Sequence, residues 1–263
     1  MTANDVLRFS DLNLAAYIRE MTRWNAPGEI FEQNDLLLTK GPGTSPVTSV
    51  AMSLHNGDDH AAIDRFDRIR LFYRERKSSF SIHIRKHADA ALESICLREK
   101  MIQISDAPGM MTDRPLKDIT APEGIEIRHI VDVDGVIDFA SVTTQSYQSL
   151  GMPVQTGQQI FASPERLLQP YNYLVVAYDQ EQPVSAAMIL FSHSIAGIYW
   201  VGTLEHYRGR GLAHTCVCQV THEAFRRGAT MAVLQASKFG APLYHRMGFK
   251  EITRYPWYMY IEK

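Results

Sequence analysis

Residues 196–227 read AGIYWVGTLEHYRGRGLAHTCVCQVTHEAFRR, and this stretch contains the change from strand to helix on which the fold depends. Its first part is rich in β-branched and aromatic side chains and predicts a strand over 196–203. Further along, apolar side chains recur at every fourth position, as on the buried face of a helix: Leu212, Cys216, Val220 and Ala224. A helix that ends at Gly228 is therefore predicted to follow the strand.

The turn between strand and helix has the sequence Arg208-Gly209-Arg210-Gly211. Glycines let a bulky anion approach the backbone closely. The first N–H groups of a helix have no partner inside the helix, and the helix dipole places partial positive charge there. Arg208 and Arg210 add formal positive charge. The turn therefore predicts a site for a phosphate or pyrophosphate group.

The same turn meets the pattern Arg/Gln-x-x-Gly-x-Gly/Ala through Arg208, Gly211 and Ala213. In this it resembles the GNAT superfamily of acyl-CoA-dependent N-acyltransferases, in which the segment holds the pyrophosphate of coenzyme A. Taken alone, the pattern also fits a basic turn in front of a buried helix. A dinucleotide-binding fold is not favoured, because it requires G-x-G-x-x-G and an acidic residue about twenty positions on, and neither is present in that form.

A second block, LQASKFGAPLYHRMGF over 234–249, resembles the other characteristic segment of the same superfamily. Residues 231–234 predict a short strand, and Gly240-Ala241-Pro242 opens a short helix that Gly248 ends. The two blocks stand in the superfamily's order, at a spacing that fits helix, strand and helix. The chain is therefore identified as a member of the GNAT superfamily, with an α/β fold around a mixed sheet.

The resemblance implies a site for acetyl-CoA in the second half of the chain. It implies that Tyr244 donates a proton to the leaving thiolate, that backbone groups of 201–203 pair with the pantetheine arm, and that amides of 209–214 bind the pyrophosphate. Ser237 falls where the superfamily often has asparagine, and a helix cap is an equally good interpretation. The residues expected to contact acetyl-CoA are Val201, Gly202, Thr203, Arg208, Gly209, Arg210, Gly211, Leu212, Ala213, His214 and Ser237.

The base that would accept a proton from the amine is harder to find. A lysine-type amine with a pKa of about 10.4 costs roughly 4.6 kcal/mol to deprotonate at pH 7. Many superfamily members carry a glutamate on the strand before the phosphate turn, but residues 196–203 contain no carboxylate. Glu205 lies nearby and is the candidate base, with His206 and His193 as further candidates. A chain of water molecules to a distant group is the open alternative.

The acceptor region of this fold corresponds to residues 141–170, which are rich in Gln, Thr and Ser and nearly free of acids. Tyr147, Met152 and Phe161 are expected to form its apolar walls. We therefore expect an enzyme that moves the acetyl group of acetyl-CoA to a primary amine of a small molecule or peptide by direct attack, without a metal. A non-catalytic acyl-CoA sensor is the alternative, because the strand lacks a carboxylate. Whether two copies of the chain form a homodimer is left open by the sequence.

The length of 263 residues fits one large or two small domains. Residues 112–124 contain two prolines and few apolar side chains, which predicts a linker. Over 125–263 the elements are expected in the order β, α, α, β, β, β, α, β, α, β, the order of the GNAT fold. Residues 101–108 weakly repeat the pattern of 249–256. We therefore interpret 1–111 as a smaller, degenerate GNAT-like domain that does not bind coenzyme A, and 125–263 as the catalytic domain.

Apolar periodicity also predicts the elements of the N-terminal half. The expected helices cover 5–24, 60–74 and 88–98, and the expected strands cover 31–39, 47–55, 80–84 and 101–104. In the C-terminal half, one helix is expected over 133–147. The next is expected to begin at Ser163, with Ser163 as its N-cap and Pro164 at its first position.

The composition excludes some functional classes. A net charge of −2 gives no general attraction to nucleic acid or an anionic membrane. No apolar run approaches the ~18 residues of a membrane span, and Asp5 and Asp11 interrupt the start of the chain. We therefore expect a cytoplasmic protein without nucleic-acid or membrane partners. The three cysteines are expected to be reduced thiols.

Two polar clusters are interpreted as surface features. The segment His55-Asn56-Gly57-Asp58-Asp59-His60 lacks the ligand spacing of zinc sites and predicts a solvated turn. His83 and His87 straddle a predicted strand end and are not expected to act together. A run of arginines interleaved with aspartates predicts a helix surface with ion pairs, formed by Arg65, Arg68, Arg70, Arg74 and Arg76.

Overall fold

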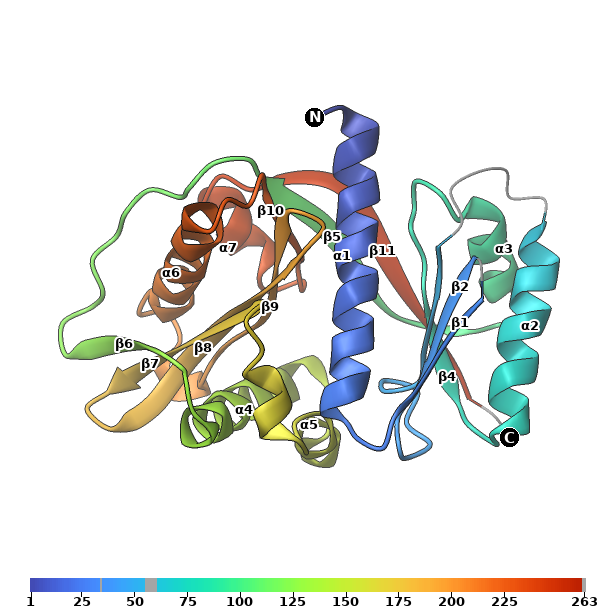
Figure 1. Cartoon of the computed structure of the whole chain (residues 1–263), viewed down its shortest axis with the longest axis horizontal. Coiled ribbons are helices and arrows are strands. Elements are labelled where there is room, and N and C mark those ends of the chain that lie inside the picture. The colour runs from blue at the N-terminus through green and yellow to red at the C-terminus, as the bar shows by residue number, and fades with distance from the viewer. Residues whose placement is uncertain (34, 55–60, 262–263) are drawn as a thin grey trace. The chain divides into compact units, whose positions relative to one another are not determined.

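The structure, a computed structural model, describes residues 1–33, 35–54 and 61–261. The chain forms two compact units (Figure 1). The first comprises Met1–Met110, Gln235–Ala241 and Glu251–Lys263, and the second comprises Met111–Leu234 and Pro242–Lys250. The domain division at 112–124 stays a prediction; the structure adds that two C-terminal segments belong to the first unit. The predicted turn at 55–60 lies outside the described residues.

The first unit is a mixed sheet with helices on both faces. Figure 1 shows α1 on one face and α2 and α3 on the other. Its strands lie in the order β1-β2-β3-β4-β11-β5. The elements are α1 (Ala3–Trp24), β1 (Glu29–Gln33), β2 (Leu36–Lys40), β3 (Val50–Ser53), α2 (Ala62–Glu75), β4 (Phe80–His83), α3 (Ala90–Arg98), β5 (Ile102–Thr112) and β11 (Lys250–Tyr260).

Local sequence explains how the helices of this unit begin and pack. Thr2 caps α1, because its hydroxyl accepts the Asp5 N–H at 3.2 Å while the Asp5 carboxylate accepts the Thr2 N–H at 2.9 Å. The apolar face of α2 is buried against the sheet, and Tyr73 stacks on Phe80 with ring centroids 4.6 Å apart. Burial of each such large side chain stabilises the fold by about 1.5–3 kcal/mol.

Some predicted boundaries in this unit are wrong. Residues 31–33 and 36–39 belong to two antiparallel strands, with Gln33 paired to Leu36; the leucines at 36–38 are buried, whereas residues 31–33 are exposed. The strand predicted over 47–55 covers only Val50–Ser53, and the one predicted over 101–104 begins a strand that reaches Thr112. The ends of these strands are determined by their pairing with neighbouring strands, which the periodicity of a single sequence does not reveal.

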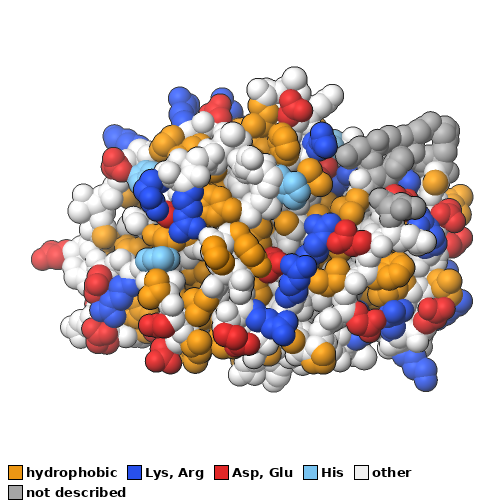
Figure 2. Space-filling view, in the orientation of Figure 1, with side chains coloured by type: hydrophobic (Ala, Val, Ile, Leu, Met, Phe, Trp, Pro, Cys, Tyr) orange, Lys and Arg blue, Asp and Glu red, His pale blue; other side chains and the backbone are white. Residues whose placement is uncertain are grey.

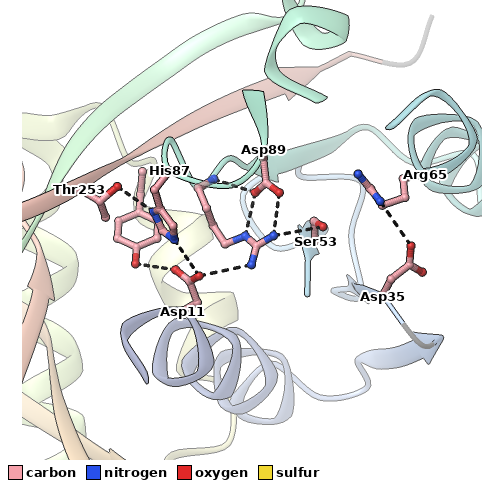
Figure 3. A network of polar contacts seen from close by, with 9 residues as sticks. Asp11, Asp35, Ser53, Arg65, His87, Asp89 and Thr253 are labelled. Atoms are coloured by element: carbon pink, nitrogen blue, oxygen red, sulfur yellow. Dashed lines mark hydrogen bonds and ion pairs between the residues drawn. The ribbon is translucent and has the colours of Figure 1, made fainter. Parts of the chain in front are cut away.

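The C-terminal strand β11 completes the sheet of the first unit. It lies between β4 and β5 and runs antiparallel to β4. Figure 3 shows the polar contacts that hold it. On β11, the Tyr255 hydroxyl donates to Asp11 Oδ1 at 2.8 Å, and Thr253 Oγ1 lies 2.8 Å from His87 Nδ1. The sequence did not indicate that the last strand would lie between β4 and β5.

The same network contains Arg85, which is 1% exposed. Its guanidinium donates to both oxygens of Asp89, at 2.9 and 2.8 Å, and to Asp11 Oδ2 at 3.3 Å. A buried charge requires such partners, because desolvation of an unpaired ion is costly. His87 Nε2 lies 3.1 Å from Asp11 Oδ2, whereas His83 stacks on Trp257, so the two histidines are in separate environments.

The arginines of α2 mostly form ion pairs. Arg68 contacts Asp35 at 2.8 Å and Asp64 at 3.0 Å, and Arg76 contacts Glu29 at 2.9 Å. Arg65 departs from the predicted surface role, because it is 2% exposed. It faces inward on α2 with a nitrogen 4.0 Å from Asp35 (Figure 3). On the face shown in Figure 2, basic and acidic side chains are interspersed.

The second unit is a five-stranded sheet in the order β10-β9-β8-β7-β6. Figure 1 shows α6 on one face and α4 and α5 on the other. Strand β10 runs parallel to β9, and the other pairs are antiparallel. The elements are β6 (Ile125–His129), α4 (Val133–Tyr147), η2 (Gln148–Leu150), α5 (Val154–Ile160), η3 (Pro164–Leu167), β7 (Asn172–Asp179), β8 (Gln182–Ser192), β9 (Ile195–Thr203), η4 (Glu205–Tyr207), α6 (Leu212–Arg226), β10 (Ala232–Gln235) and α7 (Ala241–Arg246).

The predicted strand, turn and helix of the opening stretch are confirmed as β9 and α6. Gly228 ends α6 with φ +86°, and the Ala229 N–H donates to the Ala224 carbonyl at 3.0 Å, as in a Schellman motif.

The prediction of a helix that begins at Ser163 is wrong. Only a 3₁₀ turn follows Ser163, whose side chain makes no cap, and the α-helix lies earlier, at Val154–Ile160.

No helix in the described ranges has the length and apolar character needed to cross a bilayer. The predicted linker lies partly against α6, since the Leu116 carbonyl is 2.8 Å from His222 Nε2.

Candidate functional site

A bulge in β9 shapes one side of the candidate site. Tyr199 pairs with Met188 and Gly202 with Ala186, so Trp200 and Val201 together face a single residue of β8. Trp200 has φ +52°, which is strained for a bulky side chain. Strand β10 pairs with β9 only at Ala196 and Gly197. The later residues of β9 are therefore not paired with β10, and they include the predicted contacts Val201, Gly202 and Thr203.

The glycine turn lies directly after this strand and η4. Gly209 has φ +78° and Gly211 has φ +81°, and a Cβ added to either would meet nothing within 4 Å. These backbone angles favour glycine, and the open space leaves the backbone accessible. Gly211 is the N-cap of α6 without a side-chain cap. The first N–H groups of α6, from Leu212, Ala213 and His214, have no partner within a helix and can receive an anion.

The two arginines of the turn have different surroundings. Both side chains are exposed, and the Arg210 guanidinium lies 4.8 Å from the centre of the Tyr207 ring. Arg208 donates to the Thr203 carbonyl at 3.3 Å, to the Ser146 carbonyl at 3.3 Å and to Ser149 Oγ at 3.0 Å. The sequence pattern treated both as charges for a phosphate and did not distinguish them.

Tyr244 lies on α7 and is 7% exposed. Burial raises the pKa of its hydroxyl well above the ordinary value, and the nearby Tyr147 adds to the shift. Burial raises the pKa of Tyr147 in the same way. Within the described part of the chain, the Tyr244 hydroxyl has no hydrogen-bond partner. It is therefore protonated at neutral pH and free to donate.

Aromatic side chains gather beside the bulge. Trp200 lies between Tyr147, at a centroid distance of 5.0 Å, and Phe161, at 4.9 Å. The Trp200 indole N–H is buried and has no partner among the described residues. The predicted walls Tyr147 and Phe161 therefore meet on a residue that the sequence did not single out; Met152 is half-buried and its N–H donates to the Tyr147 carbonyl at 3.2 Å. The aromatic run in β9 was the only available sign of this role.

The candidate bases lie at the surface. Glu205 and His206 are exposed in η4, next to the glycine turn. His193 is exposed in the turn before β9, at the opposite end of that strand from Thr203. Ser237 Oγ accepts the Gly240 N–H at 3.1 Å, which is the contact of a cap. A cofactor role for Ser237 stays a prediction.

Close packing ties α4 to β9 at Gly202. A Cβ on this glycine would lie 2.0 Å from Ser146 Oγ and 3.0 Å from Ser146 Cβ. Ser146 Oγ is itself held, because it donates to the Thr143 carbonyl at 3.0 Å. Glycine at 202 therefore allows the end of α4 to contact the strand directly.

Replacing Gly202 by alanine should lower the free energy of unfolding by about 1–3 kcal/mol, as overpacking does elsewhere. Urea denaturation followed by circular dichroism measures this change. In the double variant Gly202→Ala with Ser146→Ala, the atom at 2.0 Å is gone, and most of the loss should be recovered. An equal loss in both variants would contradict the packing explanation.

Comparison with known proteins identifies the fold. Residues 144–256 match the family model of the acetyltransferase (GNAT) domain. No curated protein matches the sequence. A GCN5-related N-acetyltransferase from Kribbella flavida aligns with 93% of this chain and 94% of its own, at 18% identity and a TM-score of 0.72.

Two further solved structures are similar. A GCN5-related N-acetyltransferase from Sphaerobacter thermophilus aligns with 86% of this chain and 80% of its own, at 17% identity and a TM-score of 0.60. A tandem GNAT protein from the clavulanic acid biosynthesis pathway aligns with 99% of this chain and 96% of its own, at 11% identity and a TM-score of 0.63. The predicted α/β fold with a mixed sheet is confirmed: residues 144–256 match the GNAT acetyltransferase domain, and the chain has the GNAT fold.

Proposed function

We propose that the protein transfers the acetyl group of acetyl-CoA to a primary amine of a small molecule or a peptide. A GNAT acetyltransferase domain indicates acyl-CoA-dependent acetyl transfer in general. The observation that carries the specific proposal is the open glycine turn at the start of α6, which follows the bulged end of β9 within one unit.

The proposed binding residues follow from this arrangement. The N–H groups of 209–214 receive the pyrophosphate, and the Arg210 guanidinium adds charge at the exposed rim. The backbone of 201–203, which β10 leaves unpaired, forms hydrogen bonds with the pantetheine arm as an added strand would. The thioester then lies toward the bulge at Trp200, with the aromatic side chains beside it.

In the proposed reaction, the nitrogen lone pair of the amine attacks the thioester carbonyl carbon. A carbon–nitrogen bond forms, the carbon–sulfur bond breaks, and the thiolate takes a proton from the Tyr244 hydroxyl, which solvent then reprotonates. The amine loses its extra proton to water or to Glu205, the candidate base at the surface. Tyr244 is protonated over the neutral pH range, which is the state that a proton donor requires.

Release of free thiol tests this proposal. The protein is incubated with acetyl-CoA and a panel of primary amines, while calorimetry measures acetyl-CoA binding beside it. Thiol release that depends on an amine supports the transferase.

The second candidate function is an acyl-CoA sensor, which is favoured by the absence of any carboxylate from residues 196–203. Binding of acetyl-CoA without thiol release for any amine would support the sensor instead.

A further inference from the structure

Arg208 connects three segments of the second unit. Its Nε donates to the carbonyl of Thr203 at the end of β9, at 3.3 Å. Its Nη2 donates to the carbonyl of Ser146 near the end of α4, at 3.3 Å, and to Ser149 Oγ in η2, at 3.0 Å. A guanidinium is planar and its donors are fixed relative to one another. These bonds therefore hold the three acceptors in fixed positions relative to one another.

The segment 146–149 that Arg208 holds is part of the proposed acceptor wall. Ser146 is 6% exposed and lies against Gly202. The next residue is Tyr147, whose ring lies 5.0 Å from Trp200 and whose hydroxyl is close enough to Tyr244 to raise its pKa. A shift of this segment would therefore move Tyr147 relative to both the bulge and the proton donor.

Arg210 offers a direct comparison two positions along. It is exposed, as Arg208 is, but it lies over the Tyr207 ring at 4.8 Å and has no hydrogen bond to any described residue. Its guanidinium can turn toward a phosphate without losing a protein contact. Arg208 would have to give up three hydrogen bonds to do the same.

We infer that Arg208 is a positioning residue, which fixes the segment 146–149 against the end of β9 and so places Tyr147 for the amine acceptor. The phosphate charge in the turn then comes from Arg210. This inference rests on the proposed function for its kinetic consequences, but its structural part can be tested without turnover. It differs from the role that the sequence pattern implied, in which Arg208 contacts coenzyme A.

The variants Arg208→Ala and Arg210→Ala form the test. For Arg208→Ala, the Kd of acetyl-CoA in calorimetry should stay within about twofold, while the KM of the amine should rise about tenfold or more, because misplaced binding groups are costly. Hydrogen exchange of the amides in 147–152 should become faster, since local opening becomes easier. For Arg210→Ala, the Kd should rise severalfold and exchange in 147–152 should be unchanged.

Ser149→Ala provides a second variant that retains the Arg208 charge and removes one acceptor. It should raise the amine KM and the exchange rate in the same direction as Arg208→Ala, by a smaller factor. A rise of the acetyl-CoA Kd in Arg208→Ala that equals or exceeds that of Arg210→Ala, with unchanged exchange in 147–152, would overturn the inference. If the wild type binds no acetyl-CoA, the proposed function fails, and the exchange measurements still decide whether Arg208 holds the segment.

Discussion

Replacing Tyr244 by phenylalanine should lower kcat for acetyl transfer by about 100- to 10,000-fold, the range of general-acid contributions. The ring stays, so its contact with Phe249, at a centroid distance of 5.7 Å, is preserved. Only the hydroxyl is removed, which is protonated at neutral pH and has no hydrogen-bond partner in the described residues. The Kd of acetyl-CoA should change little, because the phosphate and pantetheine contacts lie elsewhere.

The matched control is Tyr147→Phe. Tyr147 is half-buried and the pKa of its hydroxyl is also raised, but its ring packs against Trp200 in the proposed acceptor wall. Its removal should lower kcat less than the removal of the Tyr244 hydroxyl. Steady-state kinetics with a saturating amine and calorimetry with acetyl-CoA measure both effects. Unchanged turnover in Tyr244→Phe would exclude the residue as the acid, and a larger loss in Tyr147→Phe would transfer the role to Tyr147.

Features determined by neighbouring residues were predicted correctly. The helix α6 begins and ends where the glycines at 211 and 228 indicated, because a left-handed backbone position is a local property of glycine. The short helix α7 follows Gly240 and contains Pro242 in its first turn, as the second block predicted. The conformation of the turn before α6 could therefore be predicted from the sequence, while its phosphate-binding role stays a prediction.

Features that depend on pairing between distant strands were not predicted. The bulge at Trp200 exists only relative to β8, and nothing in the residues around 200 indicates that two of them face one partner. The insertion of β11 beside β4 likewise depends on partners far away in the sequence. The buried position of Arg65 was missed because charge patterns alone do not reveal which side of a helix faces the core.

The error at Ser163 has a different cause. Ser followed by Pro and Glu is a strong local signal for the start of a helix, and the structure does turn there. Only a 3₁₀ turn forms at this point. It already buries Leu167, and strand β7 begins a few residues later, at Asn172. The α-helix that does form, α5, contains Gly157, and a Cβ there would lie 2.4 Å from Thr144 Oγ1, so close packing against α4 requires glycine.

Replacing Gly211 by glutamate should raise the Kd of acetyl-CoA by about 100-fold or more, through two effects at one position. A side chain at φ +81° strains the backbone by roughly 1–3 kcal/mol. The carboxylate would also stand at the start of α6, where the proposed pyrophosphate lies, and like charges there repel. Calorimetry measures the Kd directly.

Gly228→Glu is the matched control, because it introduces a similar backbone strain at a position outside the proposed phosphate site. Gly228 has φ +86°, is exposed and ends the same helix, so the substitution brings comparable strain and the same charge to the other end of α6. It should lower the free energy of unfolding at least as much, because the helix dipole disfavours a carboxylate at this end. It should leave the Kd within about twofold, since the charge lies more than a Debye length of ~10 Å along a helix that rises about 1.5 Å per residue. If Gly211→Glu bound acetyl-CoA as well as Gly228→Glu does, the start of α6 would not be the phosphate site.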